Sequence, residues 1–512
     1  MKGETKLSQT GTLVLGGKIT LEQFVAVARG NVRVEFSAEY EERVAKARRL
    51  IEKAVSENRV MYGVTTGFGA LSAQVINRDE SARLQRNIIM SHSVSVGEPL
   101  AIEQARAVML MVLQNTGQGF SGIRLEVLRL LRDMLNKGLT PWMPCEGSVG
   151  YLAPEAHMSL VLIGEGKAYW KGNLLPGADA MKLAGIQPAE LSFKEGLALI
   201  SGTTSATGLA SLALYDMLNA ANTADLIAAV SLEAQKGVMR AFDKRVMDIR
   251  PHEHQGATAD VLRRLLSDSQ VLKHYEGGRL QDALSLRCIP QLHGAAKKTL
   301  YDAKKTIEIE INSCCDNPVI FEQDGAADIV SACNADSSYV GLAMDCSVIA
   351  CTMIAKMSER RNNRFLDGNL SGYPHFLVKN PGLNSGLMIP QYTQAGLLGD
   401  MRILSTPSVI DNTPTCCNQE DYVAMGYNAS KKALKAAGYL EYILAIELLS
   451  GYQAQQFIEA GLKRSSATAK VLEKLSGAIP IMEEDMFLHP HIEHIRGLIH
   501  EGSILETLKP ET

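Results

Sequence analysis

Apolar residues recur at helical spacing over long stretches of the second half of this chain. The clearest run begins at Ser205 and continues to about Ala241, and two others cover about 339–361 and 430–456. Apolar positions that repeat every three to four residues predict helices, and these runs exceed the usual helix of roughly 11–12 residues. Ala, Gly and Ser lie on several faces, which favours close packing on all sides. The pattern predicts long, mostly buried helices in a bundle, with contacts between subunits.

The first 200 residues are richer in Gly and Pro, and their patterns are shorter. The stretch TLVLGG predicts a short strand, and ITLEQFVAVARG predicts a helix that Thr20 opens. We therefore expect a mainly α protein with two domains. Residues 1–200 would form a loop-rich N-terminal domain, and residues 201–512 a domain of long helices.

Composition narrows the functional classes. The chain is 46% hydrophobic and 21% charged with a net charge of −4, which is typical of a soluble globular protein and argues against a nucleic-acid partner. No apolar run reaches the roughly 18–20 residues that span a bilayer, and no secretory signal is evident. The nine cysteines include no CxxC pair, which fits a reducing compartment. The sequence thus predicts a cytoplasmic protein without membrane contact.

A glycine-rich stretch, YGVTTGFG, begins at Tyr62. Its three glycines allow positive φ, so the segment can form a mobile loop that closes over a pocket. A tyrosine there could act as a general base if nearby cations lowered its pKa. Taken alone, such a stretch is more often a simple turn.

Three further segments carry polar or charged side chains that could form hydrogen bonds with a ligand. Ser91-His92 offers an imidazole that can both donate and accept hydrogen bonds. Arg287, in SLRCIPQ, offers a planar guanidinium that can hold a carboxylate through two hydrogen bonds. Glu420, in NQED, offers a carboxylate that could face a ring N–H. The histidines at 252, 254, 489, 491 and 494 do not complete a four-ligand metal set, so no metal is expected.

These motifs, together with GSVGYLAPEAHM at 147–158, resemble those of the histidine and aromatic amino-acid ammonia-lyase family in their sequences and in their order along the chain. The resemblance extends from about residue 10 to residue 465. The resemblance implies the ammonia-lyase fold, which is related to fumarase, and a homotetramer whose sites combine several subunits. It also implies that Tyr62 removes the β-proton and Arg287 holds the substrate carboxylate. Ser91 and His92 would touch an imidazole ring that Glu420 also faces. Tyr62, Arg287 and Glu420 would come from different subunits.

The chain departs from the family where the cofactor forms. In the family, GSVG is followed by Ala-Ser-Gly, which cyclises into the electrophile methylidene-imidazolone (MIO), and then by Asp; here Tyr151 follows Gly150 directly. Ser201 and Thr204 replace the asparagine and glutamine of the family's NGTQ, and Leu284 replaces a tyrosine. Asn334-Ala335-Asp336 falls on the family's Asn-Phe-His. These departures predict a lyase that uses no cofactor.

A lyase without MIO needs a substrate that already carries a leaving group. A trimethylammonium nitrogen has no lone pair with which to attack MIO, and it leaves as neutral trimethylamine. Ala335 would give room for it, Asp336 charge and Tyr151 a π-face. We expect Tyr151, Ser201, Leu284, Asn334 and Asp336 to contribute to substrate binding. The chain is thus predicted to follow the ergothionase branch of the family and to split ergothioneine, a histidine betaine, into thiolurocanate and trimethylamine.

Two other functions stay open at this point. The first is an MIO-dependent histidine ammonia-lyase or aminomutase, because a cyclised tripeptide is a single non-standard residue that can be missing from a one-letter sequence. The second is an inactive relative that binds an imidazole metabolite. Asp336 could also simply cap a helix, and Tyr151 could simply fill the space of the tripeptide.

Overall fold

The computed structural model describes residues 11–508 except 31, 58, 62–63, 68, 72–73, 75 and 77–79. The chain forms two compact units. Unit 1 comprises Met1–Tyr215, Lys304–Asp345 and Pro407–Lys431, and unit 2 comprises Asp216–Ala303, Cys346–Thr406 and Lys432–Thr512. Each unit is thus assembled from separate stretches of chain, whereas the sequence suggested one division near residue 200.

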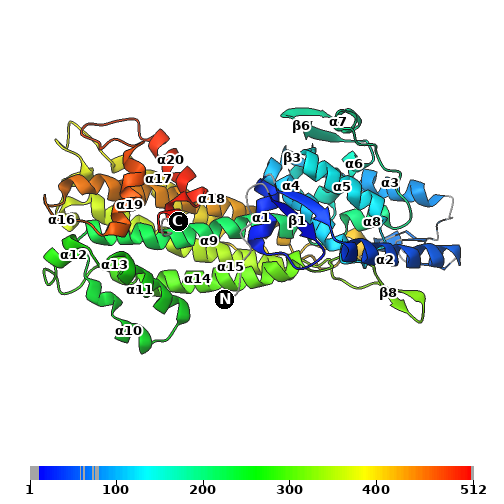
Figure 1. The fold of residues 1–512 in the computed structure, drawn as a ribbon, viewed down its shortest axis with the longest axis horizontal. Helices are drawn as coiled ribbons and strands as arrows, with labels where there is room; N and C mark the ends of the chain where they lie inside the picture. Colours follow the sequence, from blue (N-terminus) through cyan, green and yellow to red (C-terminus); the bar gives the residue numbers. More distant parts are fainter. Residues whose placement is uncertain are drawn as a thin grey trace. The chain divides into compact units, whose positions relative to one another are not determined.

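Four long helices continue from one unit into the other: α9 (Thr204–Ala234), α14 (Ile289–Ile311), α15 (Ser338–Leu366) and α18 (Gly426–Gln453). Within unit 2, α9, α15 and α18 lie side by side (Figure 1), and Glu447 of α18 bonds both Ser231 of α9 and Arg361 of α15. The predicted long helices are confirmed. The first ends at Ala234 rather than near residue 241, because Lys236 takes a left-handed φ of 57° and the Gly237 N–H closes on the Leu232 carbonyl at 2.8 Å.

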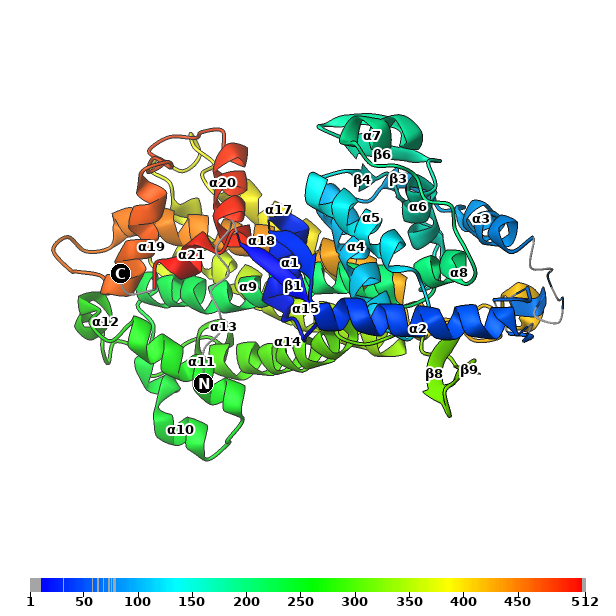
Figure 2. The same ribbon diagram turned by 45° about the vertical axis from the view of Figure 1, so that its right-hand side comes forward.

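Unit 1 contains eight shorter helices among its described residues: α1 (Leu21–Arg29), α2 (Ala38–Ser56), α3 (Ser81–His92), α4 (Ile102–Thr116), α5 (Leu125–Lys137), α6 (Ala153–Leu162), α7 (Gly177–Ala184) and α8 (Glu195–Ile200). The helix predicted after Thr20 is α1. Thr20 and Gln23 cap it reciprocally, since each side chain accepts the other's backbone N–H. In Figure 2, α3, α6 and α8 lie close together, and these three helices contact one another.

Short strands complete unit 1: β1 (Thr12–Leu15), β2 (Arg33–Phe36), β3 (Val96–Pro99), β4 (Thr140–Pro141), β5 (Pro144–Glu146), β6 (Lys167–Trp170), β7 (Asn173–Pro176), β8 (Val319–Gln323) and β9 (Ala326–Val330). β1 pairs with β2 in parallel, with Thr12 opposite Arg33. The pairs β3–β5, β4–β6, β6–β7 and β8–β9 are antiparallel. The strand predicted in TLVLGG is β1.

Unit 2 adds α10 (Lys244–Asp248), α11 (Glu253–Leu265), α12 (Gln270–His274), α13 (Leu284–Arg287), α16 (Gly368–Ser371), α17 (Met388–Leu404), α19 (Ser466–Ser476), α20 (His489–His500) and α21 (Ser503–Glu506). The fold is mainly α, as predicted.

Two helical stretches are long and apolar enough to cross a membrane by length and composition, namely Glu195–Ala234 and Ser338–Leu366. The sequence suggested that no such stretch exists. The apolar window of the first is wholly buried inside the protein, and most of the second is buried too, which is typical of core helices. Cytoplasmic localisation stays a prediction.

Candidate active site

The segment from Ser148 to Leu152 joins β5 to α6 through a tight turn. The Ser148 hydroxyl accepts the Gly150 N–H at 3.3 Å and donates to the Tyr151 carbonyl at 3.2 Å. Leu152 has φ 79° and ψ −64°, a conformation that costs a non-glycine residue about 1–3 kcal/mol. The backbone is therefore strained where this sequence is three residues shorter than the family pattern.

Tyr151 lies half-buried in acidic surroundings. Burial, followed by the nearby Glu420, Cys333, Cys416 and Asp336, raises the pKa of Tyr151 to about 12. Its phenol therefore stays protonated at neutral pH and can donate a hydrogen bond, but it is a poor base. The same proximities bring two predicted site residues, Glu420 and Asp336, to Tyr151 within unit 1.

Glu420 lies two residues after the end of the short 3₁₀ helix η5 (Cys416–Asn418). Its backbone carbonyl accepts the Thr415 N–H at 2.8 Å, and its carboxylate takes a hydrogen bond from the Cys416 thiol, which raises the pKa of Cys416. The outer oxygen Oε2 is buried and has no hydrogen-bond partner among the described residues. Glu420 thus keeps an acceptor for a ligand N–H, as its predicted role requires.

The glycine-rich loop reaches Glu420 through η1 (Gly69–Leu71). The Ala70 N–H donates to Cys416 Sγ at 3.4 Å, and a Cβ at Gly69 would lie 2.7 Å from that sulfur and 3.7 Å from Glu420 Oε1. Only glycine fits this approach, and its φ of 55° suits glycine as well. Tyr62 lies outside the described residues, but the end of its loop meets Glu420 within one chain. Whether Tyr62, Arg287 and Glu420 come from different subunits stays a prediction.

Ser91 and His92 end α3. His92 Nδ1 lies 2.8 Å from the Ile88 carbonyl, and the Ser91 hydroxyl donates to the same carbonyl at 3.2 Å. A carbonyl only accepts, so Nδ1 carries the proton and Nε2 is the unprotonated nitrogen. Burial lowers the pKa of His92. The structure therefore presents a neutral imidazole of defined tautomer at this position.

Ser201, Asn334 and Asp336 have structural partners in unit 1. Ser201 is buried, and its hydroxyl accepts the Asn317 N–H at 3.0 Å. Asp336 accepts the Ser338 N–H at 2.9 Å and so caps α15, while the Asn334 amide donates to the Cys314 carbonyl at 3.4 Å. Asp336 is thus a helix cap that also adds negative charge near Tyr151. Whether these three side chains contribute to substrate binding stays a prediction.

Arg287 and Leu284 lie at opposite ends of α13 in unit 2. Leu284 is exposed, whereas Arg287 is half-buried and its buried Nε has no hydrogen-bond partner in the part of the chain that the structure describes. A buried guanidinium N–H without a partner favours binding of an anion. This observation supports the predicted role of Arg287 with a carboxylate.

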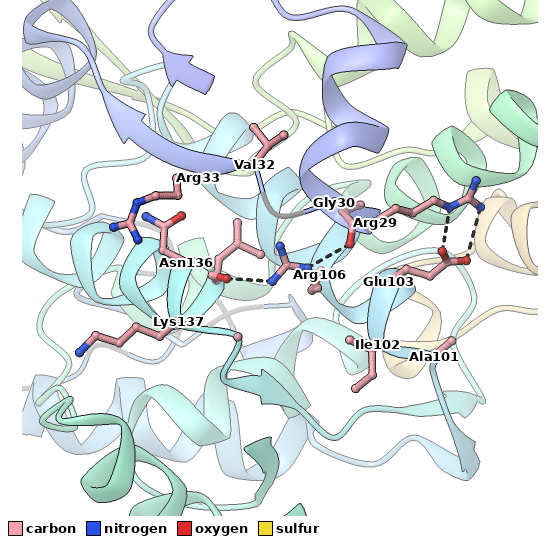
Figure 3. A pocket seen from close by; sticks show the side chains of 13 residues that line it. Arg29, Gly30, Val32, Arg33, Ala101, Ile102, Glu103, Arg106, Asn136 and Lys137 are labelled. Carbon is pink, nitrogen blue, oxygen red and sulfur yellow. Dashed lines mark hydrogen bonds and ion pairs between the residues drawn. The ribbon is translucent and has the colours of Figure 1, made fainter. Parts of the chain in front are cut away.

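A cavity of about 760 Å³ in unit 1 contains none of these residues. Figure 3 shows Arg106 at its centre, close to the ends of α1 and α5. The Arg106 guanidinium donates to the carbonyls of Val27 and Ala28 at 2.8 and 3.0 Å and to that of Leu135 at 2.8 Å. The C-terminal ends of two helices carry partial negative charge. The positive charge of the Arg106 guanidinium at this place therefore stabilises the fold. The cavity is not the candidate active site.

Comparison with known proteins decides the family. The model of the aromatic amino acid lyases matches residues 19–477. The chain belongs to the aromatic amino acid lyase family. It is 40% identical over 500 residues to a histidine ammonia-lyase from Alkaliphilus oremlandii, covering 97% of this chain and 98% of that protein. Its membership of this family makes the chain a carbon–nitrogen lyase, as predicted.

Solved structures agree on the fold. A histidine ammonia-lyase from Trypanosoma cruzi is 33% identical, with a TM-score of 0.91 over 98% of this chain and 95% of that one. The ergothionase from Treponema denticola is 26% identical, with a TM-score of 0.89 over 96% of this chain and 99% of that one. The predicted resemblance to the ammonia-lyase family is confirmed.

The comparisons overturn two predictions. The ergothionase reaction is wrong as the main function, because relatives at about 40% identity over nearly the whole lyase are histidine ammonia-lyases, whereas the ergothionase structure is more distant. The prediction that the lyase uses no cofactor is wrong for the same reason, since this family depends on MIO. The direct Gly150–Tyr151 bond and the substitutions around it therefore do not identify the substrate.

The residues at the junction do not by themselves form MIO. In this sequence Gly150 is bonded directly to Tyr151, with no Ala-Ser-Gly between them. Leu152, whose backbone is strained, is the next residue after Tyr151. Sequence reasoning also missed Glu155 and Cys416. The first was visible as a charged residue in place of the leucine in the family's LAPLAHM, whereas nothing in the sequence pointed to the second.

Proposed function

We propose that this lyase is a histidine ammonia-lyase that converts L-histidine into urocanate and ammonia. The observation that carries the proposal is the neutral His92 imidazole at the end of α3, a ring that can hydrogen-bond the imidazole of a substrate. The full-length similarity to histidine ammonia-lyases supports it.

In this proposal each side chain has one task. Arg287 holds the substrate carboxylate, since its buried Nε is otherwise unpartnered among the described residues. Glu420 Oε2 and His92 orient the imidazole. Tyr62 takes the proton from the β-carbon, the electrons of that C–H bond form the C=C bond, and the C–N bond breaks to release ammonia. MIO, when present, supplies the electrophile that makes the amine a better leaving group.

We further propose that the MIO tripeptide belongs between Gly150 and Tyr151. The left-handed Leu152 and the tight Ser148 turn support a longer native connection. Mass spectrometry of the peptide spanning residues 146–157 tests this. A mass above that of this sequence by Ala-Ser-Gly, less the two waters lost when the tripeptide cyclises and its serine dehydrates, is expected. A mass equal to that of this sequence would contradict it.

The activity test is direct. Purified lyase is incubated with L-histidine, and the products are identified by NMR, with L-tyrosine and ergothioneine as comparison substrates. Urocanate and ammonia from histidine are expected. A β-amino acid instead of urocanate would show an aminomutase, and no product from histidine would refute the proposal.

We also propose a homotetramer, as predicted from the sequence. One face of α15 exposes Tyr339, Leu342, Cys346 and Ile349, which recur every three to four residues and need an apolar partner. A second copy of this chain is the partner that a symmetric assembly supplies. Sedimentation velocity should show four chains, and Leu342→Glu should shift the protein to smaller species. A monomer in both cases would contradict the proposal.

A further inference from the structure

Glu155 is a fully buried carboxyl group close to the Gly150–Tyr151 junction. It is the third residue of α6 and has no exposed surface. Its Oε1 accepts the Thr204 hydroxyl at 2.7 Å and the Ser205 N–H at 2.6 Å, both at the start of α9. Its Oε2 is buried without a partner among the described residues. A buried carboxyl with one unused oxygen calls for an explanation.

Among the described residues, no ion pair joins this carboxyl to a cationic side chain. Burial raises the pKa of Glu155, and the hydrogen bonds from Thr204 and Ser205 and the local backbone oppose this rise. The titratable group that it does affect is the phenol of Tyr427 on α18, whose pKa it helps to raise. Glu155 therefore keeps its proton to higher pH than an exposed glutamate.

Two departures from the family pattern meet in this contact. Glu155 stands where the family has the second leucine of LAPLAHM, and Thr204 stands where the family has the glutamine of NGTQ. The shorter threonine needs an acceptor that leucine cannot give, and the longer glutamate supplies it. The two substitutions therefore compensate each other.

The contact joins two segments of the candidate site. Glu155 belongs to the helix that follows Ser148–Leu152, and Thr204 ends the turn that begins at Ser201. Gly202 in this turn has φ 128°, so backbone conformation there depends on what holds the turn. A shift of either segment would displace the groups around Tyr151.

We propose that Glu155 is a positioning residue for the lyase reaction, which with Thr204 replaces the family's leucine–glutamine pair and holds the Ser148–Leu152 segment against the Ser201–Thr204 turn. The activity readout rests on the proposed histidine lyase function. The pairing itself does not, since it can be measured through thermal stability.

A double-mutant cycle tests the pair in the full-length lyase. Glu155→Leu leaves Thr204 and Ser205 without their acceptor, which should lower kcat about 10–100-fold. Thr204→Gln should lower kcat by crowding Glu155. The double variant, which restores the family pair, should recover kcat to within about 3-fold of the parent and show non-additive Tm shifts. KM should stay nearly constant, because Glu155 does not touch substrate.

The dependence of kcat on pH distinguishes a positioning role of Glu155 from a role in stability alone. With Glu155, kcat should fall on the alkaline side as the carboxyl loses its proton. Glu155→Gln keeps the acceptor and cannot ionise, so it should keep kcat and lose that alkaline fall. Glu195→Gln is the matched control, because Glu195 is equally buried in α8 but is paired with Arg124. It should lower Tm and leave the shape of the profile unchanged.

Two results would overturn the proposal. One is an alkaline fall in kcat that persists in Glu155→Gln. The other is a double variant no better than the product of its single variants, in kcat or in Tm. If the parent protein has no histidine lyase activity, the Tm cycle still decides the pairing, so failure of the function and failure of the inference are distinguishable.

Discussion

Arg361 and Glu447 form a two-point ion pair inside unit 2, with Nε–Oε1 at 2.5 Å and Nη2–Oε2 at 2.9 Å. Neither side chain is exposed. The pair connects α15 to α18, and Ser231 of α9 adds a hydrogen bond of 2.6 Å to the same carboxylate. It therefore links three of the long helices that characterise the fold.

Removal of one partner should be costly. Arg361→Ala leaves the Glu447 carboxylate buried without its cation, which should lower the free energy of unfolding by about 3–5 kcal/mol. Urea denaturation at neutral pH measures this. The neighbouring Arg360 has a largely exposed side chain, so Arg360→Ala should cost under about 1 kcal/mol. Equal losses of unfolding free energy in the two variants would show that the buried ion pair stabilises the protein no more than the exposed one does.

Gly69 should be intolerant of any side chain. A Cβ there would lie 2.7 Å from Cys416 Sγ, on a backbone with φ 55°. Gly69→Ala should displace the loop from Glu420 and lower kcat/KM for histidine about 10-fold or more, because the geometry around Glu420 is lost. Steady-state kinetics measures the loss. Gly17→Ala is the control, since nothing lies within 4 Å of its added Cβ, and it should behave like the parent.

The pKa of His92 predicts a pH dependence of stability. Burial lowers this pKa in the folded state, so below the ordinary histidine value the unfolded state binds more protons than the folded state. Stability should therefore fall as pH drops through the ordinary value toward the folded one. His92→Gln should reduce this fall in Tm between about pH 7 and 5, whereas the exposed His252→Gln should not. An identical fall in all three proteins would contradict the prediction.

Arg106 should be a stability residue rather than a ligand-binding one. Its guanidinium bonds carbonyls at the ends of α1 and α5. Arg106→Ala should lower the free energy of unfolding by about 2–4 kcal/mol, since buried carbonyls lose charged donors. Chemical denaturation measures it, with Arg33→Ala as the control because Arg33 lines the same cavity but is exposed. A larger effect of Arg33→Ala would refute this role.

The sequence by itself determined the family, the long helices and the start of α1. Helical spacing and the Thr20–Gln23 capping box act within a few residues, so they can be read locally. The length of α9 was overestimated, because the apolar pattern continues past Lys236, where the backbone turns left-handed.

Only the tertiary structure decided what several predicted site residues touch. Ser201 meets Asn317, 116 residues away, and Glu155 meets Thr204, 49 residues away. Asp336 caps α15, and this role can be recognised only once the first residue of that helix is known. These partners depend on how distant segments pack, and a substitution seen in sequence alone does not reveal whether a neighbour has changed to compensate it. This is the physical reason why the departures around Tyr151 did not identify the substrate.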